Sequence, residues 1–198
     1  VQLGDRTLLT LIDSGSDGPF NFNPIGFSPR FVSGPRPGVA VSTLAGERIQ
    51  EVGRLDDTLR IGNYSLTRPV VDLTDQLSSI GGGILRHFTV TFDPARGNVT
   101  FYRDSTAPII MPLVRSAGLS FSRTPAYWRV AGVVPGSPAD AIGVQRGDLI
   151  TRINGEPVEK WNLLRYRELV QAATRIEFTF LNGRTEAAAN IDIFDLVQ

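Results

Sequence analysis

Apolar and polar positions alternate over short distances in the first half of the chain. Four segments are rich in β-branched and aromatic residues and are bounded by Gly, Pro, Asn or Asp, namely TLLTLID (7–13), RPVVDL (68–73), FTVTFD (88–93) and NVTFYR (98–103). This pattern predicts short strands joined by turns. The stretch 24–38 is so dense in Pro and Gly that we predict a surface loop there instead of regular structure.

Between these segments, two further stretches have a recognisable pattern. Residues 39–66 predict two or three strands separated by turns at AGE (45–47) and GN (62–63). SIGGGILRHF (79–88) predicts a Gly-rich approach to a short helix, on which Arg86 and His87 face outward. The first half is therefore expected to be mostly β.

The second half has a different pattern and begins after a Pro-containing stretch, residues 104–114. It predicts strands at 128–134 and 148–153, a short helix between them, a longer helix within 161–173, and a final strand pair. Asn182-Gly183 between the last two segments is a strong hairpin signal. Six apolar residues recur at helical spacing and predict the buried face of the longer helix: Leu163, Leu164, Tyr166, Leu169, Val170 and Ala173.

Composition narrows the possible classes of function. The 198 residues are 41% hydrophobic and 20% charged with zero formal net charge, so a polyanion or nucleic-acid binder is not indicated. No segment approaches the length of an apolar membrane helix. Cysteine is absent and His87 is the only histidine, so we expect no disulfide, no metal site and no cofactor. Because the only methionine is Met111, Val1 is not expected to be a native start.

The segment VAGVVPGSPADAIGVQRGDLITRINGEPV, residues 130–158, resembles the centre of a PDZ domain. The resemblance implies a β-sandwich or partly open barrel with two helices over residues 115–198. It also implies that the domain binds extended or C-terminal peptides by strand addition. Four residues match the family's carboxylate-binding loop, Gly118, Leu119, Ser120 and Phe121, with serine where glycine is usual; Leu164 or a neighbour would line the side-chain pocket. The alternative is that this domain packs against its neighbour and binds no peptide.

In the first half, LLTLIDSGSDGPF (8–20) places Asp13 directly after an apolar strand and follows it with Ser14, Gly15 and Ser16. On its own the triplet Asp-Ser-Gly is more often a turn with a capping aspartate. Its context, with an apolar-Gly segment about seventy residues later, resembles one lobe of the aspartic proteases over residues 1–103. With a trailing PDZ domain, the chain resembles bacterial exported aspartyl-protease-like proteins.

That resemblance implies an endopeptidase that hydrolyses extended polypeptides, in the periplasm or at the cell surface. Asp13 would supply one carboxylate of a catalytic dyad, and Ser14, Gly15 and Ser16 would orient it. The chain has no second Asp-(Ser/Thr)-Gly, so the other carboxylate must come from a second copy of the chain or from another lobe. The candidate flap hairpin, residues 39–55, has no Tyr or Trp, which favours another lobe.

The sequence therefore predicts a mostly β chain with a protease-like lobe at 1–103, a linker at 104–114 and a PDZ domain at 115–198. The rival hypothesis is a non-catalytic peptide-binding or scaffold protein in which Asp13 is a satisfied turn carboxylate. His87 is expected at the surface or as a cap, and Trp128 and Trp161 are expected to serve packing.

Overall fold

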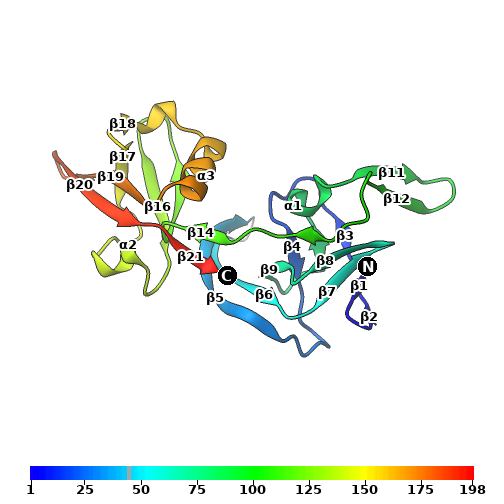
Figure 1. The fold of residues 1–198 in the computed structure, drawn as a ribbon. Coiled ribbons are helices and arrows are strands. Elements are labelled where there is room, and N and C mark those ends of the chain that lie inside the picture. The colour runs from blue at the N-terminus through cyan, green and yellow to red at the C-terminus, as the bar shows by residue number, and fades with distance from the viewer. Residues whose placement is uncertain (44–45) are drawn as a thin grey trace. The chain divides into compact units, whose positions relative to one another are not determined.

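The computed structural model describes residues 1–43 and 46–198, and the turn predicted at 45–47 lies partly outside the described residues. The chain divides into two compact units (Figure 1). The N-terminal unit comprises Val1–Arg36, Glu51–Pro112 and Val197–Gln198, and the C-terminal unit comprises Pro37–Gln50 and Leu113–Leu196. The main division between Pro112 and Leu113 falls within the predicted linker.

Most strands of the N-terminal part are short, as the closely spaced turn residues predict, and β5 and β6 are the long exceptions. They form a five-stranded sheet in the order β13-β8-β7-β1-β2, a six-stranded sheet in the order β3-β10-β4-β9-β6-β5, and a separate hairpin of β11 and β12. The bounds are β1 (Gln2–Leu3), β2 (Arg6–Thr7), β3 (Leu11–Ile12), β4 (Phe20–Phe22), β5 (Phe31–Thr43), β6 (Gly46–Leu55), β7 (Thr58–Ile61), β8 (Tyr64–Thr67), β9 (Val70–Leu73), β10 (Ser79–Ile80), α1 (Gly82–Leu85), β11 (Thr89–Asp93), β12 (Asn98–Tyr102) and β13 (Ile109–Ile110).

One prediction for this part is wrong in detail. The predicted loop at 24–38 becomes strand β5 from Phe31 onward. β5 is the edge strand of its sheet, and an edge strand is where prolines such as Pro35 and Pro37 are tolerated, because part of its backbone has no neighbouring strand to donate to. Within the predicted linker, 104–114, β13 pairs in parallel with β8.

Arg54 on β6 is an unusual member of the interior of the N-terminal unit, since its residue exposure is 8%. Its guanidinium donates to the carbonyl oxygens of Gln198 (2.6 Å), Arg68 (3.0 Å), Met111 (3.4 Å) and Pro112 (2.7 Å). Burial lowers the pKa of Arg54. One side chain therefore holds three separate chain segments to β6. The other buried residues of this unit are mostly apolar and include Phe20, Phe22, Leu59, Ile61, Leu66 and Ile84.

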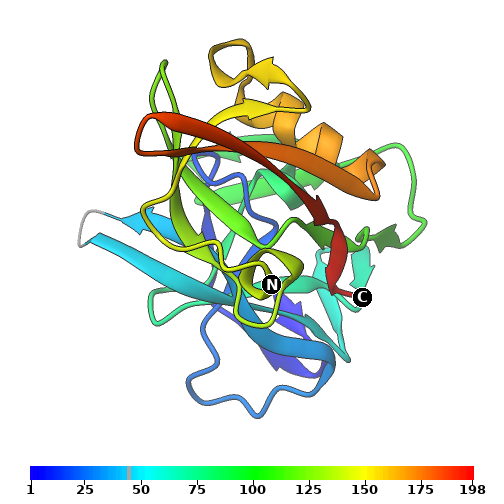
Figure 2. The same cartoon turned by 90° about the vertical axis from the view of Figure 1, so that its left-hand side faces the viewer.

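The C-terminal unit contains the mixed pattern that the sequence predicts. Its main sheet has the order β15-β16-β17-β19-β20, β18 pairs with β17, and β14 pairs with β21. Both views in Figures 1 and 2 show α3 beside the strands of this sheet. The bounds are β14 (Val114–Ser116), β15 (Leu119–Arg123), β16 (Trp128–Val133), α2 (Pro138–Ala141), β17 (Leu149–Ile153), β18 (Glu156–Pro157), a 3-10 turn (Val158–Lys160), α3 (Leu163–Ala172), β19 (Arg175–Asn182), β20 (Thr185–Asp192) and β21 (Phe194–Val197).

Local sequence explains where these helices begin. Asn162 caps α3, because its side chain accepts a hydrogen bond from the Arg165 amide at 2.9 Å. Ser137 caps α2 in the same way through the Asp140 amide at 3.3 Å, and Pro138 follows at the first helical position. The predicted hairpin between β19 and β20 is confirmed, with Gly183 in the left-handed region at φ +63°.

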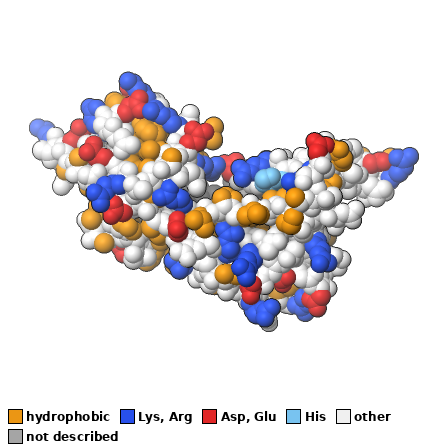
Figure 3. All heavy atoms as spheres, in the orientation of Figure 1, with side chains coloured by type: hydrophobic (Ala, Val, Ile, Leu, Met, Phe, Trp, Pro, Cys, Tyr) orange, Lys and Arg blue, Asp and Glu red, His pale blue; other side chains and the backbone are white. Residues whose placement is uncertain are grey.

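The surface has no dominant charge. On the face shown in Figure 3, basic and acidic side chains are interspersed over both units, in keeping with the zero formal net charge. Within the described ranges, no helix combines the length and the apolar character needed to cross a lipid bilayer. The same residues contain no group of three or more His, Cys, Asp or Glu that could hold a metal ion.

Candidate functional site

A cavity of about 360 Å³ lies in the C-terminal unit, and its walls come from β14 and β15 with their connecting loop, and from α3. β15 is the edge strand of the main sheet. An edge strand that faces a helix across a partly apolar cleft can accept an additional strand. The lining residues are Arg115, Ser116, Ala117, Leu119, Ser120, Phe121, Leu163, Tyr166, Arg167, Val170 and Gln171.

The floor of this cavity rests on packed aromatic rings. The ring of Phe121 lies 5.3 Å from that of Trp128 and 5.4 Å from that of Tyr166, measured between centroids. Tyr166 packs edge-on against Trp128 at 5.6 Å. Burial raises the pKa of the Tyr166 phenol. Aromatic pairs of this kind add to the free energy gained by burial, so these contacts stabilise the floor.

The loop at one end of the cavity is shaped by Gly118. This residue has φ +76°, and its amide donates to the Ser116 hydroxyl at 2.9 Å. A Cβ at this position would lie 2.4 Å from Ser137 Oγ. Gly118 is therefore required both for its backbone conformation and for its close approach to Ser137.

The predicted peptide-binding residues are partly brought together. Leu119, Ser120 and Phe121 line the cavity, and Gly118 shapes the adjoining loop. Ser120, which replaces the glycine usual in PDZ domains, is buried, and its hydroxyl lies 3.4 Å from the Gly132 carbonyl oxygen. On the helix, where Leu164 or a neighbour was predicted, Leu163 lines the cavity whereas Leu164 is 66% exposed.

Sequence reasoning missed two arginines on the cavity wall. Arg167 lies on α3, and Arg115 lies on β14. Arg115 donates to the Gln171 carbonyl oxygen at 2.6 Å and lies 3.8 Å from an Asp195 carboxylate oxygen. The signal for Arg167 was in the sequence, because it lies four residues after Leu163 and three before Val170 on one helix face.

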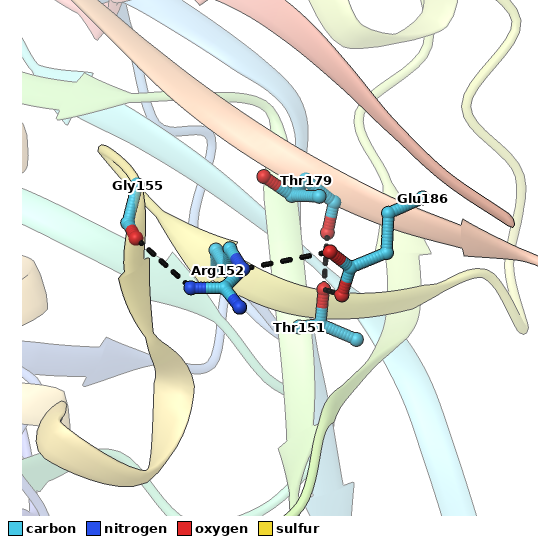
Figure 4. A network of polar contacts seen from close by, with 5 residues as sticks. All are labelled: Thr151, Arg152, Gly155, Thr179 and Glu186. Carbon is cyan, nitrogen blue, oxygen red and sulfur yellow. Dashed lines mark hydrogen bonds and ion pairs between the residues drawn. The ribbon is translucent and has the colours of Figure 1, made fainter.

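A polar network lies on the same sheet (Figure 4), and none of its residues lines the cavity. The Thr151 hydroxyl is 2.7 Å from Glu186 Oε1, and Arg152 Nε is 3.5 Å from Glu186 Oε2. The hydrogen bond from Thr151, aided by Arg152, lowers the pKa of Glu186. The network joins β17 to β20, which is the edge of the sheet opposite β15. Exposed contacts of this kind add little stability.

Asp13, the residue singled out in the first half, forms a local turn. The Gly15 amide donates to Asp13 Oδ1 at 3.0 Å, and the Ser16 amide lies 3.3 Å from the Asp13 carbonyl oxygen. The Gly-rich segment after β10 packs against the chain that follows this turn, and the Gly82 amide donates to the Ser16 carbonyl oxygen at 2.7 Å. This is the geometry of the capping aspartate in a turn, with Ser14 and Gly15 exposed.

Asp72 on β9 is a more unusual carboxyl near the same turn. Its Oδ2 lies 3.2 Å from the position that a Cβ on Gly18 would occupy, and its register partner is Asn21 on β4. Burial raises the pKa of Asp72 to about 6. Compared with the unfolded chain, the folded N-terminal unit therefore favours the protonated form of this carboxyl.

The raised pKa of Asp72 predicts a dependence of stability on pH. Because the pKa of Asp72 is higher in the folded state than its usual value, the folded state binds this proton more tightly than the unfolded chain does. The stability that the bound proton contributes is fully present below about pH 4 and is lost as the pH rises through about 6. We expect the free energy of unfolding of the N-terminal unit to fall by about 2 kcal/mol from pH 4 to pH 7 through this group. Urea unfolding followed by far-UV circular dichroism should show a smaller fall in Asp72→Asn. The matched control is Asp5→Asn on an exposed turn, and an unchanged slope in Asp72→Asn would contradict the prediction.

His87 is half-buried and lines another cavity, which lies in the N-terminal unit. The cavity is also lined by Arg86 and Arg103. Burial, and then the positive charges of Arg86 and Arg103, lower the pKa of His87.

Comparisons with known proteins agree with the geometry of the C-terminal unit. Residues 129–181 match the PDZ domain family, so the chain contains a PDZ domain. No curated protein sequence matches the chain. Among solved structures, the HtrA3 PDZ domain bound to a phage-derived ligand (FGRWV) is 22% identical, with a TM-score of 0.37; the match covers 42% of this chain and 88% of that one.

Two other matches extend beyond the PDZ domain. The HtrA-type protease AlgW, with a decapeptide, is 15% identical at a TM-score of 0.40, and the match covers 81% of this chain and 61% of that one. The serine endoprotease from Yersinia pestis is 16% identical at a TM-score of 0.39, covering 90% of this chain and 66% of that one. The chain thus spans less than two thirds of the length of either protease.

The aspartic-protease family and the aspartic-type endopeptidase activity predicted from the sequence are corrected. The two proteases matched over most of the chain are an HtrA-type protease and a serine endoprotease, and neither is an aspartic protease. The dyad role of Asp13, with Ser14, Gly15 and Ser16 around it, loses its basis, and so does the second lobe or homodimer partner that the dyad required. The chain is a mostly β protein that contains a PDZ domain.

Proposed function

We propose that the protein is a peptide-binding protein and that the groove between β15 and α3 holds an extended peptide. The observation that carries this proposal is the partly apolar cavity of about 360 Å³ between an edge strand and a helix. An extended peptide can continue the sheet beside β15 through main-chain hydrogen bonds. The match of residues 129–181 to the PDZ domain family supports the same binding mode.

The walls of the groove indicate how such a peptide would be selected. Leu119, Leu163 and Val170 offer an apolar pocket for a side chain, and Phe121 with Tyr166 forms its floor. Apolar side chains buried there contribute affinity in proportion to the area removed from water. The loop at Gly118, where β15 begins, is where we place the peptide carboxylate. The predicted location in the periplasm or at the cell surface stays a prediction.

Two neighbouring leucines on α3 provide the test. Leu163 lines the groove, whereas Leu164 is 66% exposed and lies outside it. Placing an aspartate in the apolar pocket would bury a charge against the ligand, so Leu163→Asp should weaken binding by roughly tenfold or more. Leu164→Asp introduces the same charge beside the groove wall and should leave affinity within about twofold.

The binding measurement is fluorescence anisotropy with the full chain and labelled hexapeptides that end in Val, Leu, Ile, Phe or Ala. Each peptide is prepared with a free and with an amidated C-terminus, which separates carboxylate capture from strand addition alone. Absence of binding to every peptide would contradict the proposed function. Equal losses in Leu163→Asp and Leu164→Asp would place the peptide elsewhere.

A further inference from the structure

We propose that the groove selects peptides that carry an acidic side chain, and that Arg167 on α3 recognises this side chain. This inference rests on the proposed function and names the class of peptide that the same groove would take. Its basis is charge complementarity, because two cationic side chains, Arg115 and Arg167, line the cavity. Among the described residues that line it, none is acidic.

The placement of Arg167 follows from helix periodicity. The lining residues on α3 are spaced by three and four positions, so they share one face of the helix: Leu163, Tyr166, Arg167, Val170 and Gln171. Arg167 is therefore on the same wall as the apolar pocket. Its side chain is exposed, so a ligand carboxylate could reach the guanidinium at the edge of the groove with little loss of hydration.

Arg115 adds positive charge at the end of the groove where β15 begins. It is fixed there by its hydrogen bond to the Gln171 carbonyl oxygen, and its acidic neighbour Asp195 lies 3.8 Å away. The other charged residues of α3, Arg165 and Glu168, do not line the cavity. The Arg165 guanidinium lies 2.6 Å from a Glu156 carboxylate oxygen and 3.9 Å from the centre of the Trp161 ring.

We expect the groove to distinguish acidic from neutral peptides by a small difference in affinity. An acidic side chain at the groove edge gains Coulomb attraction in a medium close to water, where exposed ion pairs contribute at most about 1 kcal/mol, or roughly fivefold in affinity. Because this attraction acts between exposed charges, about 0.5 M salt should remove most of it. For an uncharged ligand of the same shape, we expect neither this attraction nor a dependence of affinity on salt.

The experiment compares matched peptide pairs that differ by Glu against Gln at each of the last four positions in turn. Affinities are measured by anisotropy for the full chain at low salt and in about 0.5 M NaCl. At one position or more, the Glu peptide should bind roughly three- to fivefold more tightly than its Gln counterpart at low salt. Arg167→Gln should bring this ratio close to one, while Arg165→Gln, the matched control on the same helix, should leave it unchanged.

Two outcomes would overturn the inference while leaving the proposed function intact. One is a Glu-to-Gln ratio close to one at every position in the unmodified chain. The other is a ratio that persists in Arg167→Gln, which would assign the selectivity to another cation. A failure of all peptides to bind, charged or neutral, would instead count against the proposed function itself. Thermal unfolding of both variants confirms that the comparison is made between folded proteins.

Discussion

Replacing Arg54 by methionine should lower the free energy of unfolding of the N-terminal unit by about 3 kcal/mol. Methionine keeps much of the apolar stem but removes every donor that serves four carbonyl oxygens. A hydrogen bond from a charged donor contributes about 1.5–3 kcal/mol, and an acceptor left buried without a donor is costly. Removal of the buried charge offsets part of this loss, because the guanidinium no longer has to be desolvated.

The two units can be followed separately in this experiment. Both tryptophans, Trp128 and Trp161, lie in the C-terminal unit, so fluorescence reports its unfolding, whereas far-UV circular dichroism reports both units. Arg54→Met should shift the circular dichroism transition and leave the fluorescence midpoint in place. Arg60→Ala, which removes an exposed arginine from β7, should change stability by no more than about 0.5 kcal/mol. An equally small effect of Arg54→Met would show that the four carbonyl contacts add no net stability.

Arg54 also shows a limit of sequence-based prediction. An isolated arginine in a strand pattern is normally a solvated residue, and no short-range signal indicates that its four acceptors come from positions 14, 57, 58 and 144 residues away. The same limit applies to β5, where the density of Pro and Gly predicted a loop. Their effect on a strand depends on whether the strand lies at a sheet edge, which is a property of the whole sheet.

The PDZ domain could be predicted because its signals are local. The Asn182-Gly183 turn acts within a few residues, and the structure contains the hairpin that it predicts. The register of α3 was less certain, because adjacent apolar residues at Leu163 and Leu164 both fit a helical period. Only packing decides between them, and it places Leu163 on the groove.

The Asp-Ser-Gly-Ser motif shows why a short motif is weak evidence for chemistry. An aspartate followed by small residues suits a catalytic loop, but it equally suits a turn in which the carboxylate accepts a backbone amide. Asp13 makes that contact with Gly15. The Asp72 carboxyl near the same turn carries the raised pKa, yet nothing in VVDL, which reads as an ordinary buried strand, indicated this in the sequence.

In the groove itself, Gly118→Ala should have the largest effect. A Cβ on Gly118 would lie 2.4 Å from Ser137 Oγ and 2.6 Å from Ser137 Cβ, and the residue would also have to keep φ +76°. The left-handed conformation costs an L-residue about 1–2 kcal/mol, and overpacking adds about 1–3 kcal/mol. We therefore expect the free energy of unfolding of the C-terminal unit to fall by about 3 kcal/mol.

The effect should extend to peptide binding because Gly118 and Ser137 are linked through the backbone. The Val134 amide donates to the Gly118 carbonyl oxygen at 2.8 Å, and the Ser137 amide donates to that of Val134 at 3.1 Å. Moving Ser137 disturbs this chain together with the cap of α2. The loop at the start of β15 then shifts, and affinity for a peptide with a free carboxylate should fall by roughly tenfold.

Gly136→Ala separates the two causes of this destabilisation. Gly136 has nearly the same backbone conformation, φ +73°, but a Cβ there would meet nothing within 4 Å. Gly136→Ala should therefore lower the free energy of unfolding by only about 1 kcal/mol, through left-handed backbone strain, and should leave peptide affinity unchanged. Tryptophan fluorescence during urea unfolding gives the stabilities, and anisotropy gives the affinities. Equal losses of stability in the two variants would mean that backbone strain alone makes Gly118 necessary, and that Ser137 can move aside at no cost.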